Sequence, residues 1–168
     1  MFNLDKTKLR LAIPFFLRLK YLSNYLCIVV LGELIEEESG KITGQRVLDV
    51  EGPKMETSFK MNGKFGGIEG SDIGTYCTVM REGSEPGVMY GEGQGVITTK
   101  DGQGMATWTG QGIGRFTAPG KISFRGSVFY HTTSTGGGEI SFLNNVVGVF
   151  EYEMDEQGNS STKVWEWK

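Results

Sequence analysis

Two glycine-rich tracts contain the polar residues best placed to do chemistry, GEGQG at 91–95 and GQGIG at 110–114. Such tracts cradle phosphates when they join a strand to a helix, because the backbone amides at the helix start then face the anion. Here the glycines alternate with period two, which is typical of strands, and no helical period follows either tract. The pattern therefore argues against a nucleotide site.

The side chains between these glycines are predicted to form cross-strand pairs. A two-residue turn at Asp101-Gly102 sets Glu92 opposite Gln111 and Gln94 opposite Thr109. A polar group inside a protein costs about 1–3 kcal/mol unless it is paired. The four residues therefore either satisfy one another or hold the polar part of a ligand.

Arg46 and Tyr90 complete the predicted site. Arg46 shares one side of a predicted strand with Ile42 and Leu48, which points it inward, and a turn at Ser39-Gly40 sets Glu33 opposite it. A buried arginine–carboxylate pair either anchors an acidic ligand group or is a plain structural ion pair. The predicted ligand-binding residues are Arg46, Tyr90, Glu92, Gln94, Thr109 and Gln111.

The sequence contains no recognisable catalytic triad or metal-binding motif. His131 is the only histidine, and we expect the two cysteines, Cys27 and Cys77, to be free thiols in a reducing cytosol. The acidic run at 36–38 is expected to be a solvated strand end. We expect no metal and no cofactor. Acid–base chemistry by a single carboxylate stays open, so the sequence does not decide whether the protein is an enzyme.

Glycine-containing turns predict an antiparallel all-β domain over 31–168. The chain has 26 glycines and four prolines, and Ser39-Gly40, Asn62-Gly63, Asp101-Gly102 and Ala118-Pro119 separate β-rich runs. Eight to ten sequential strands would close into an up-and-down barrel, since closure removes exposed edges. The predicted strands are 31–38, 41–50, 54–61, 64–70, 73–81, 87–99, 104–115, 120–132, 139–153 and 161–167.

The distribution of bulky side chains predicts which strand face lies inside. Beside the Asp101-Gly102 turn, one face holds the glycines and Trp108. With a turn at Ala118-Pro119, the opposite face collects the bulky residues, which are Val88, Val96, Ile113, Phe124, Val128 and Tyr130. We therefore assign this bulky face, with the predicted ligand-binding residues, to the interior. The glycine face, with Trp108 lying across the glycines, is assigned to the outside.

Residues 1–30 differ from the rest in charge and hydropathy. They carry five basic side chains against one aspartate, so the net charge of −3 leaves −7 on the remainder. Residues 9–31 are largely apolar, but a proline and two basic residues interrupt the run of about 20 that a spanning helix needs. The segment is either a helical extension, packed on the barrel or touching a membrane surface, or a stretch upstream of a natural start near Val29 or Val30.

The acidic character of residues 31–168 argues against nucleic acid as a partner, because phosphate binding needs a basic surface. No small-residue cleavage site of a signal peptide follows the apolar segment. We therefore expect a cytoplasmic protein.

Three stretches, GKITGQRVLDVEGPKMETSF, GEGQGVITTKDGQGMATWTGQGIGRF and FLNNVVGVFEYEMDEQGNSSTKVWEWK, resemble a group of bacterial and archaeal proteins similar to the allene oxide cyclase-like barrels. The resemblance covers about residues 31–168. It implies an eight-stranded, calycin-like barrel with an apolar cavity, often oligomeric through its outer faces. The plant cyclases isomerise a fatty-acid epoxide in that cavity. Their functional residues do not align with specific positions here, so none is carried over.

Three functions are consistent with these patterns. The first is binding of a small apolar or amphipathic molecule in the barrel cavity. The second is a cyclase- or isomerase-type enzyme that acts on a lipid-like substrate. The third is an oligomeric structural module, in which the glycine-rich outer face forms a flat interface between copies of the chain.

Overall fold

The computed structural model describes residues 31–168 except 82, 84–86 and 133–138. The expectations for residues 1–30, including Cys27, and for the glycine triplet within 133–138 lie outside the described residues.

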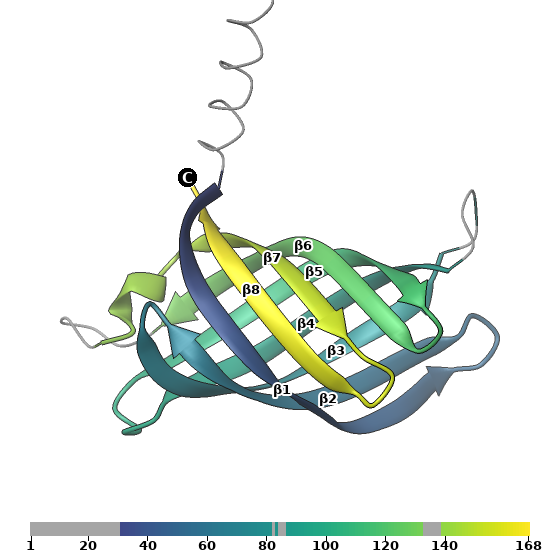
Figure 1. Cartoon of the computed structure of the whole chain (residues 1–168), viewed down its shortest axis with the longest axis horizontal. Coiled ribbons are helices and arrows are strands. Elements are labelled where there is room, and N and C mark those ends of the chain that lie inside the picture. Colours follow the sequence, from purple (N-terminus) through teal and green to yellow (C-terminus); the bar gives the residue numbers. More distant parts are fainter. Residues whose placement is uncertain (1–30, 82, 84–86, 133–138) are drawn as a thin grey trace, which may run out of the picture. The chain divides into compact units, whose positions relative to one another are not determined.

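In the described part of the chain, eight antiparallel strands follow one another in sequence order and close into a barrel (Figure 1). This confirms the predicted all-β up-and-down barrel. The strands are β1 (Leu31–Asp49), β2 (Lys54–Phe65), β3 (Ile68–Met80), β4 (Val88–Thr99), β5 (Met105–Ala118), β6 (Lys121–Thr132), β7 (Val147–Met154) and β8 (Asn159–Trp167), with a 3-10 turn η1 (Ser141–Leu143) between β6 and β7.

Two of the predicted turns are wrong, and this reduces ten predicted strands to eight. Ser39 pairs directly with Asn62, so Ser39-Gly40 and Asn62-Gly63 lie inside β1 and β2. The turn between β2 and β3 is instead Gly66-Gly67, with φ of 57° and 88°. A two-residue hairpin turn of this kind needs positive φ at both positions, which glycine adopts without strain. The predicted strand 139–153 is also wrong at its start, where η1 precedes β7.

The Asp101-Gly102 turn and its register are confirmed, and Gly95 lies opposite Trp108 as predicted. The next register is wrong by one residue. The turn is Pro119-Gly120 and not the predicted Ala118-Pro119, and with the bulge between Phe116 and Ala118 it sets Gly112 opposite Gly126, where the predicted turn sets it opposite Arg125. Because side chains alternate, a shift of one residue moves a whole strand to the other face.

The interior face is consequently the opposite of the one predicted. Phe124, Val128 and Tyr130 share the face of the glycines and Trp108, and all three are buried. Val96, predicted inside, is 39% exposed. The glycine-rich face therefore lines the barrel, which removes the outer interface on which the structural-module hypothesis depended. Homo-oligomerisation itself stays a prediction.

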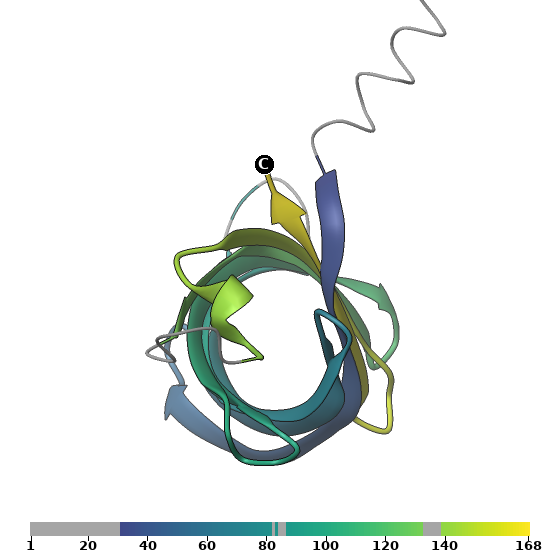
Figure 2. The same cartoon turned by 90° about the vertical axis from the view of Figure 1, so that its left-hand side faces the viewer.

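One end of the barrel is filled by a hydrophobic cluster around η1. Leu143 of η1 and the preceding Ile140 are fully buried against Phe65, Ile97 and other core residues. Figure 2 shows η1 lying over one side of the opening at this end of the ring of strands. Burial of these side chains closes the end of the barrel with apolar contacts. Within the described ranges, η1 is the one helical element, and three residues are far too few to cross a membrane.

Candidate functional site

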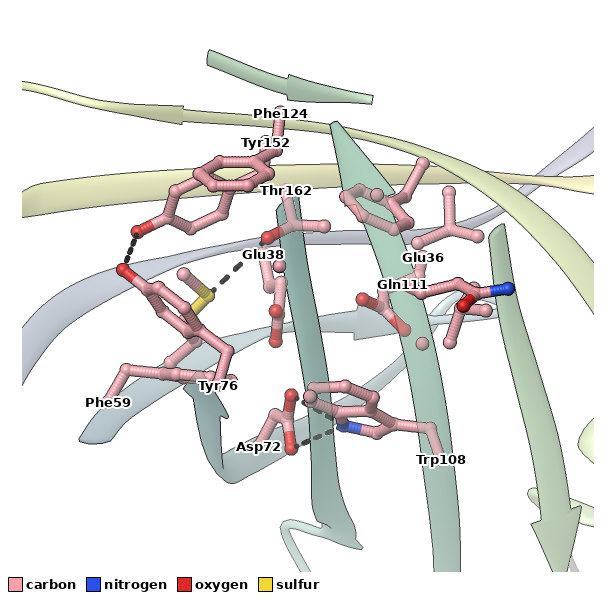
Figure 3. Close-up of a pocket in the computed structure, with 18 of the residues that line it drawn as sticks. Glu36, Glu38, Phe59, Asp72, Tyr76, Trp108, Gln111, Phe124, Tyr152 and Thr162 are labelled. Carbon is pink, nitrogen blue, oxygen red and sulfur yellow. Dashed lines mark hydrogen bonds between the residues drawn. The ribbon is translucent and has the colours of Figure 1, made fainter. Parts of the chain in front are cut away.

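The barrel interior contains a cavity of about 100 Å³ to which all eight strands contribute. A cavity of this size holds several water molecules or one small organic molecule. Figure 3 shows acidic and aromatic side chains pointing into it from several strands. Its main side chains are Glu36, Glu38, Phe59, Met61, Asp72, Tyr76, Trp108, Phe124, Val128, Tyr130, Phe150, Tyr152, Thr162 and Val164.

Three buried carboxyl groups are the dominant polar feature of this cavity. Glu36 and Glu38 lie two residues apart on β1 and so share its inward face, while Asp72 comes from β3. Their exposed fractions are 5%, 5% and 2%. Burial disfavours the charged form of a carboxyl group, so three of them in one cavity oppose ionisation strongly.

The pKa values of all three groups are accordingly raised. Burial raises the pKa of Glu36 to about 8 and that of Asp72 to about 7. Burial also raises the pKa of Glu38 well above its usual value, and the neighbouring charges of Glu36 and Asp72 add to the rise. Burial therefore shifts all three groups towards their protonated form, and at neutral pH Glu36 is mainly protonated.

Two of the carboxyl groups are held by aromatic donors. The Tyr130 hydroxyl donates to Glu36 Oε2 at 2.6 Å. The indole Nε1 of Trp108 lies 3.0 Å from each carboxyl oxygen of Asp72 (Figure 3). These hydrogen bonds offset part of the rise in the two pKa values and fix both side chains in place.

The third carboxyl group is only partly satisfied. A hydrogen bond with Thr162 offsets part of the rise in the pKa of Glu38. Its Oε2 atom is buried and has no hydrogen-bond partner among the described residues. Buried polar atoms in native proteins are nearly always partnered, by protein, water or ligand. Glu38 therefore presents an open hydrogen-bonding position to the cavity.

Aromatic rings form much of the remaining wall. Phe59 stacks on Trp108, with ring centroids 6.1 Å apart and an interplanar angle of 20°. Tyr152 meets Phe124 edge-on, and its hydroxyl lies 3.4 Å from that of Tyr76. The described residues that line the cavity include no lysine, arginine or histidine. The cavity is therefore acidic and aromatic, with no basic side chain to balance its carboxyl groups.

Glu36 and Glu38 are not among the site residues predicted from the sequence. The acidic run 36–38 was expected to be solvated, and this is correct for Glu37, which is exposed and forms an ion pair of 3.0 Å with Lys163. It is wrong for Glu36 and Glu38, which are buried. Their burial follows from pairing with β2, where Glu36 lies opposite Phe65. The alternation of Phe59, Met61 and Phe65 was visible in the sequence, but using it required the correct turn at 66–67.

Arg46 does not lie in the interior, so its predicted inward orientation is wrong. Its side chain is 70% exposed, and it lies opposite Glu56, with which it forms an ion pair of 3.1 Å. The predicted pairing with Glu33 is also wrong, because β1 continues through the proposed turn. An ion pair this exposed contributes little to stability.

The other five predicted residues lie together on the outer face of the barrel, so their predicted interior placement is wrong. The predicted pairing of Glu92 with Gln111 and of Gln94 with Thr109 is confirmed, and Tyr90 donates to Gln111 Oε1 at 2.9 Å. Glu92, Gln94, Thr109 and Gln111 have exposed side chains that border a shallow surface hollow, and two of them, Glu92 and Gln111, also border the interior cavity. As a ligand-binding set these residues stay a prediction.

Three residues could provide metal or thiol chemistry. Cys27 lies outside the described residues, and the other two, His131 and Cys77, do not line the cavity. His131 is exposed on β6, and Cys77 is a half-buried free thiol on β3. Among the described residues, no group of three or more histidine, cysteine, aspartate or glutamate side chains could hold a metal ion. The polar side-chain groups that the buried residues present to the cavity are carboxyl, hydroxyl and indole groups.

No family model matches the chain, and no curated protein matches it. Solved structures do. A protein of unknown function from Clostridium acetobutylicum ATCC 824 is 14% identical, with a TM-score of 0.66 over 81% of this chain and 97% of its own. A conserved protein of unknown function from Rhodopseudomonas palustris is 15% identical, with a TM-score of 0.62 over 80% and 95%. A beta-barrel like protein from Acinetobacter baumannii AYE is 14% identical, with a TM-score of 0.63 over 81% and 94%. At this identity the likeness shows the shared barrel fold.

Proposed function

We propose that the protein binds a small, largely apolar molecule that carries a polar group, inside the barrel. The observation that carries the proposal is the free Oε2 atom of Glu38, buried in a cavity whose wall is mainly aromatic and aliphatic. Ligand sites combine apolar walls with a few convergent polar groups that fix orientation. An unpaired buried oxygen costs about 1–3 kcal/mol, and a ligand donor that reaches it recovers this free energy.

The proposal predicts that filling the cavity abolishes ligand retention. Thr162 is half-buried and lines the cavity, so a Thr162→Phe side chain would occupy the space left for a ligand. Native mass spectrometry of wild-type protein, purified without denaturation, is expected to show an additional non-covalent mass, and the Thr162→Phe variant should lose it. Ser161→Phe is the matched control, because Ser161 is exposed on the same strand.

Two results would contradict the binding function. One is an additional mass that Thr162→Phe retains at wild-type level, which would place the molecule elsewhere. The other is a wild-type protein that carries no mass and whose cavity-lining amide signals shift with neither the neutral probe 2-phenylethanol nor its charged analogues 2-phenylethylammonium and phenylacetate. Thermal unfolding of both phenylalanine variants shows whether the barrel is intact.

A second candidate is a cyclase- or isomerase-type enzyme, in line with the allene oxide cyclase-like resemblance of the sequence. The observation in its favour is that the pKa values of Glu36 and Asp72, about 8 and 7, fall near neutral pH. Groups with such values exchange protons efficiently at that pH. Turnover of an unsaturated fatty-acid epoxide by wild-type protein, lost in Asp72→Asn, would support catalysis. Binding of the epoxide without turnover would contradict it.

A further inference from the structure

The charge of the cavity restricts the ligands that it can accept. Glu36, Glu38 and Asp72 are all at least 95% buried around one small space, and no basic side chain is among the described residues that line it. An anionic ligand would bring a negative charge that no basic side chain balances and that opposes any ionised carboxylate in this space. Coulomb repulsion at short range and low dielectric makes that unfavourable. A positively charged ligand would be attracted by every ionised carboxylate.

The unpartnered Oε2 atom of Glu38 also favours a positively charged ligand. Glu36 and Asp72 already accept hydrogen bonds from Tyr130 and Trp108, whereas Glu38 Oε2 accepts none among the described residues. A carboxylate oxygen in this position lacks a donor, so the complementary ligand group is one with N–H or O–H bonds. A charged N–H donor forms the stronger bond, roughly twice as strong as a neutral one.

The aromatic wall adds a third, independent preference. Phe59, Tyr76, Trp108, Phe124 and Tyr152 are in ring contact with one another around the cavity. The negative face of such a ring attracts cations, with tryptophan the strongest. The same faces pack against an apolar or aromatic ligand body. Carboxylates and aromatic rings together are the surroundings that recognise organic ammonium groups.

We propose that the ligand is a small organic cation, an ammonium group on an apolar or aromatic body, which donates to Glu38 Oε2 and places its charge among Glu36, Glu38 and Asp72. This inference rests on the proposed binding function and adds the class of ligand. A metal cation is a poorer occupant, since no cluster of the described residues could hold one.

Binding of the cation is coupled to proton release. The buried titratable groups that face the cavity are the three carboxyl groups and the hydroxyls of Tyr76, Tyr130 and Tyr152, and the exposed Glu92 also borders it. Burial raises the pKa of each tyrosine, so these hydroxyls stay neutral. A carboxyl group whose raised pKa keeps it protonated gives its proton to solvent as the ammonium enters. Affinity for the cation is therefore expected to rise with pH up to the pKa of the carboxyl groups, near 7 to 8 for Asp72 and Glu36.

Three isosteric probes test the inference, 2-phenylethylammonium, 2-phenylethanol and phenylacetate, which are positive, neutral and negative. Amide chemical-shift titrations of wild-type protein should give the tightest binding for the ammonium and the weakest for the carboxylate. Affinity for the ammonium should rise from about pH 5.5 to about pH 8, while that for the alcohol should not change. The ammonium stays protonated across this range.

Glu38→Gln and Glu37→Gln form the matched pair of variants. Both remove one carboxylate from β1, but Glu38 faces the cavity and Glu37 is exposed. Glu38→Gln is expected to weaken ammonium binding about tenfold and to leave 2-phenylethanol binding within about twofold, which also shows that the cavity is intact. Glu37→Gln should leave both unchanged.

The possible outcomes distinguish a failure of the cation inference from a failure of the proposed binding function. If 2-phenylethanol or phenylacetate binds as tightly as the ammonium, or if Glu38→Gln does not weaken ammonium binding selectively, the cation inference is overturned while the binding function stands. If none of the three probes shifts the cavity-lining signals, both are overturned.

Discussion

Gly95→Ala is expected to lower the midpoint of thermal unfolding by roughly 5–15 °C, although it adds a single methyl group. A Cβ atom at this position would lie 2.6 Å from Nε1 of Trp108 and 2.7 Å from its Cε2. The indole has little freedom to move, because it stacks on Phe59 and donates to Asp72. Accommodating the methyl group therefore strains the core or leaves Asp72 without its donor, at a combined cost of about 2–4 kcal/mol.

Gly44→Ala is the matched control for this substitution. Gly44 also lies in a strand, β1, but a Cβ atom there would meet nothing within 4 Å. Alanine in place of glycine reduces the entropy of the unfolded chain, so Gly44→Ala should leave stability unchanged or raise it slightly. Equal effects at positions 44 and 95 would show that Trp108 does not determine the cost.

A double-mutant cycle identifies the indole as the cause. Trp108→Leu will itself be strongly destabilising, because it removes a large, partly buried aromatic group and the donor to Asp72. In that background Gly95→Ala should cost little, since the atoms that it would strike are gone. The coupling free energy from urea unfolding should therefore be large, on the order of 1–3 kcal/mol. Additive effects would contradict a steric origin.

The Gly95–Trp108 contact also shows how far the sequence predicts the fold. The turn at Asp101-Gly102 has a strong local signal, so the register that places Trp108 opposite Gly95 could be derived. The prediction that Trp108 lies across glycines is correct. The prediction of which face lines the barrel is wrong because of the next turn. The bulge between Phe116 and Ala118 depends on how two strands coil together and has no distinct sequence signal.

The candidate site was harder to predict than the fold, for a physical reason. Three consecutive glutamates ordinarily face water, since burying a carboxyl group is costly. The burial of Glu36 and Glu38 is determined by their partners on β2, residues about 25 positions away in sequence, and by Tyr130 on β6. Asp72 lies in a strand whose other inward residues include Gly70 and Gly74, so the hydropathy of its neighbours does not predict that it is buried. Sites that violate local preferences in this way are often functional.

The same three carboxyl groups are expected to make the ligand-free barrel less stable as the pH rises from 5 to 9. The folded state binds protons more tightly than the unfolded chain, because the pKa of Glu36 is raised from 4.5 to about 8 and that of Asp72 from 3.8 to about 7. The stability due to these groups is therefore fully present below about pH 4 and is lost as the pH rises through about 7 to 8.

The expected loss is on the order of 5 kcal/mol, which is what the rise of the Glu36 pKa from 4.5 to about 8 alone corresponds to, because the shifts of interacting groups do not add. For a barrel of this size it corresponds to a fall of roughly 10 °C or more in the midpoint of thermal unfolding. Exposed carboxylates such as Asp101 and Asp155 have lowered pKa values, and their contribution is lost only as the pH falls towards these values. Measurements between pH 5 and 9 therefore avoid the titration of these exposed carboxylates.

Amide variants assign this pH dependence to the cavity. Glu36→Gln combined with Asp72→Asn keeps the shape of both side chains and removes two of the three titrations, so its unfolding midpoint should decline clearly less than that of wild type over the same range. Glu37→Gln, which alters the exposed neighbour, should decline as wild type does. A wild-type midpoint that is constant or rises between pH 5 and 9 would mean that these carboxyl groups are ionised without penalty in the folded protein. It would also remove the proton release predicted for cation binding, because a group that is already ionised has no proton to give up.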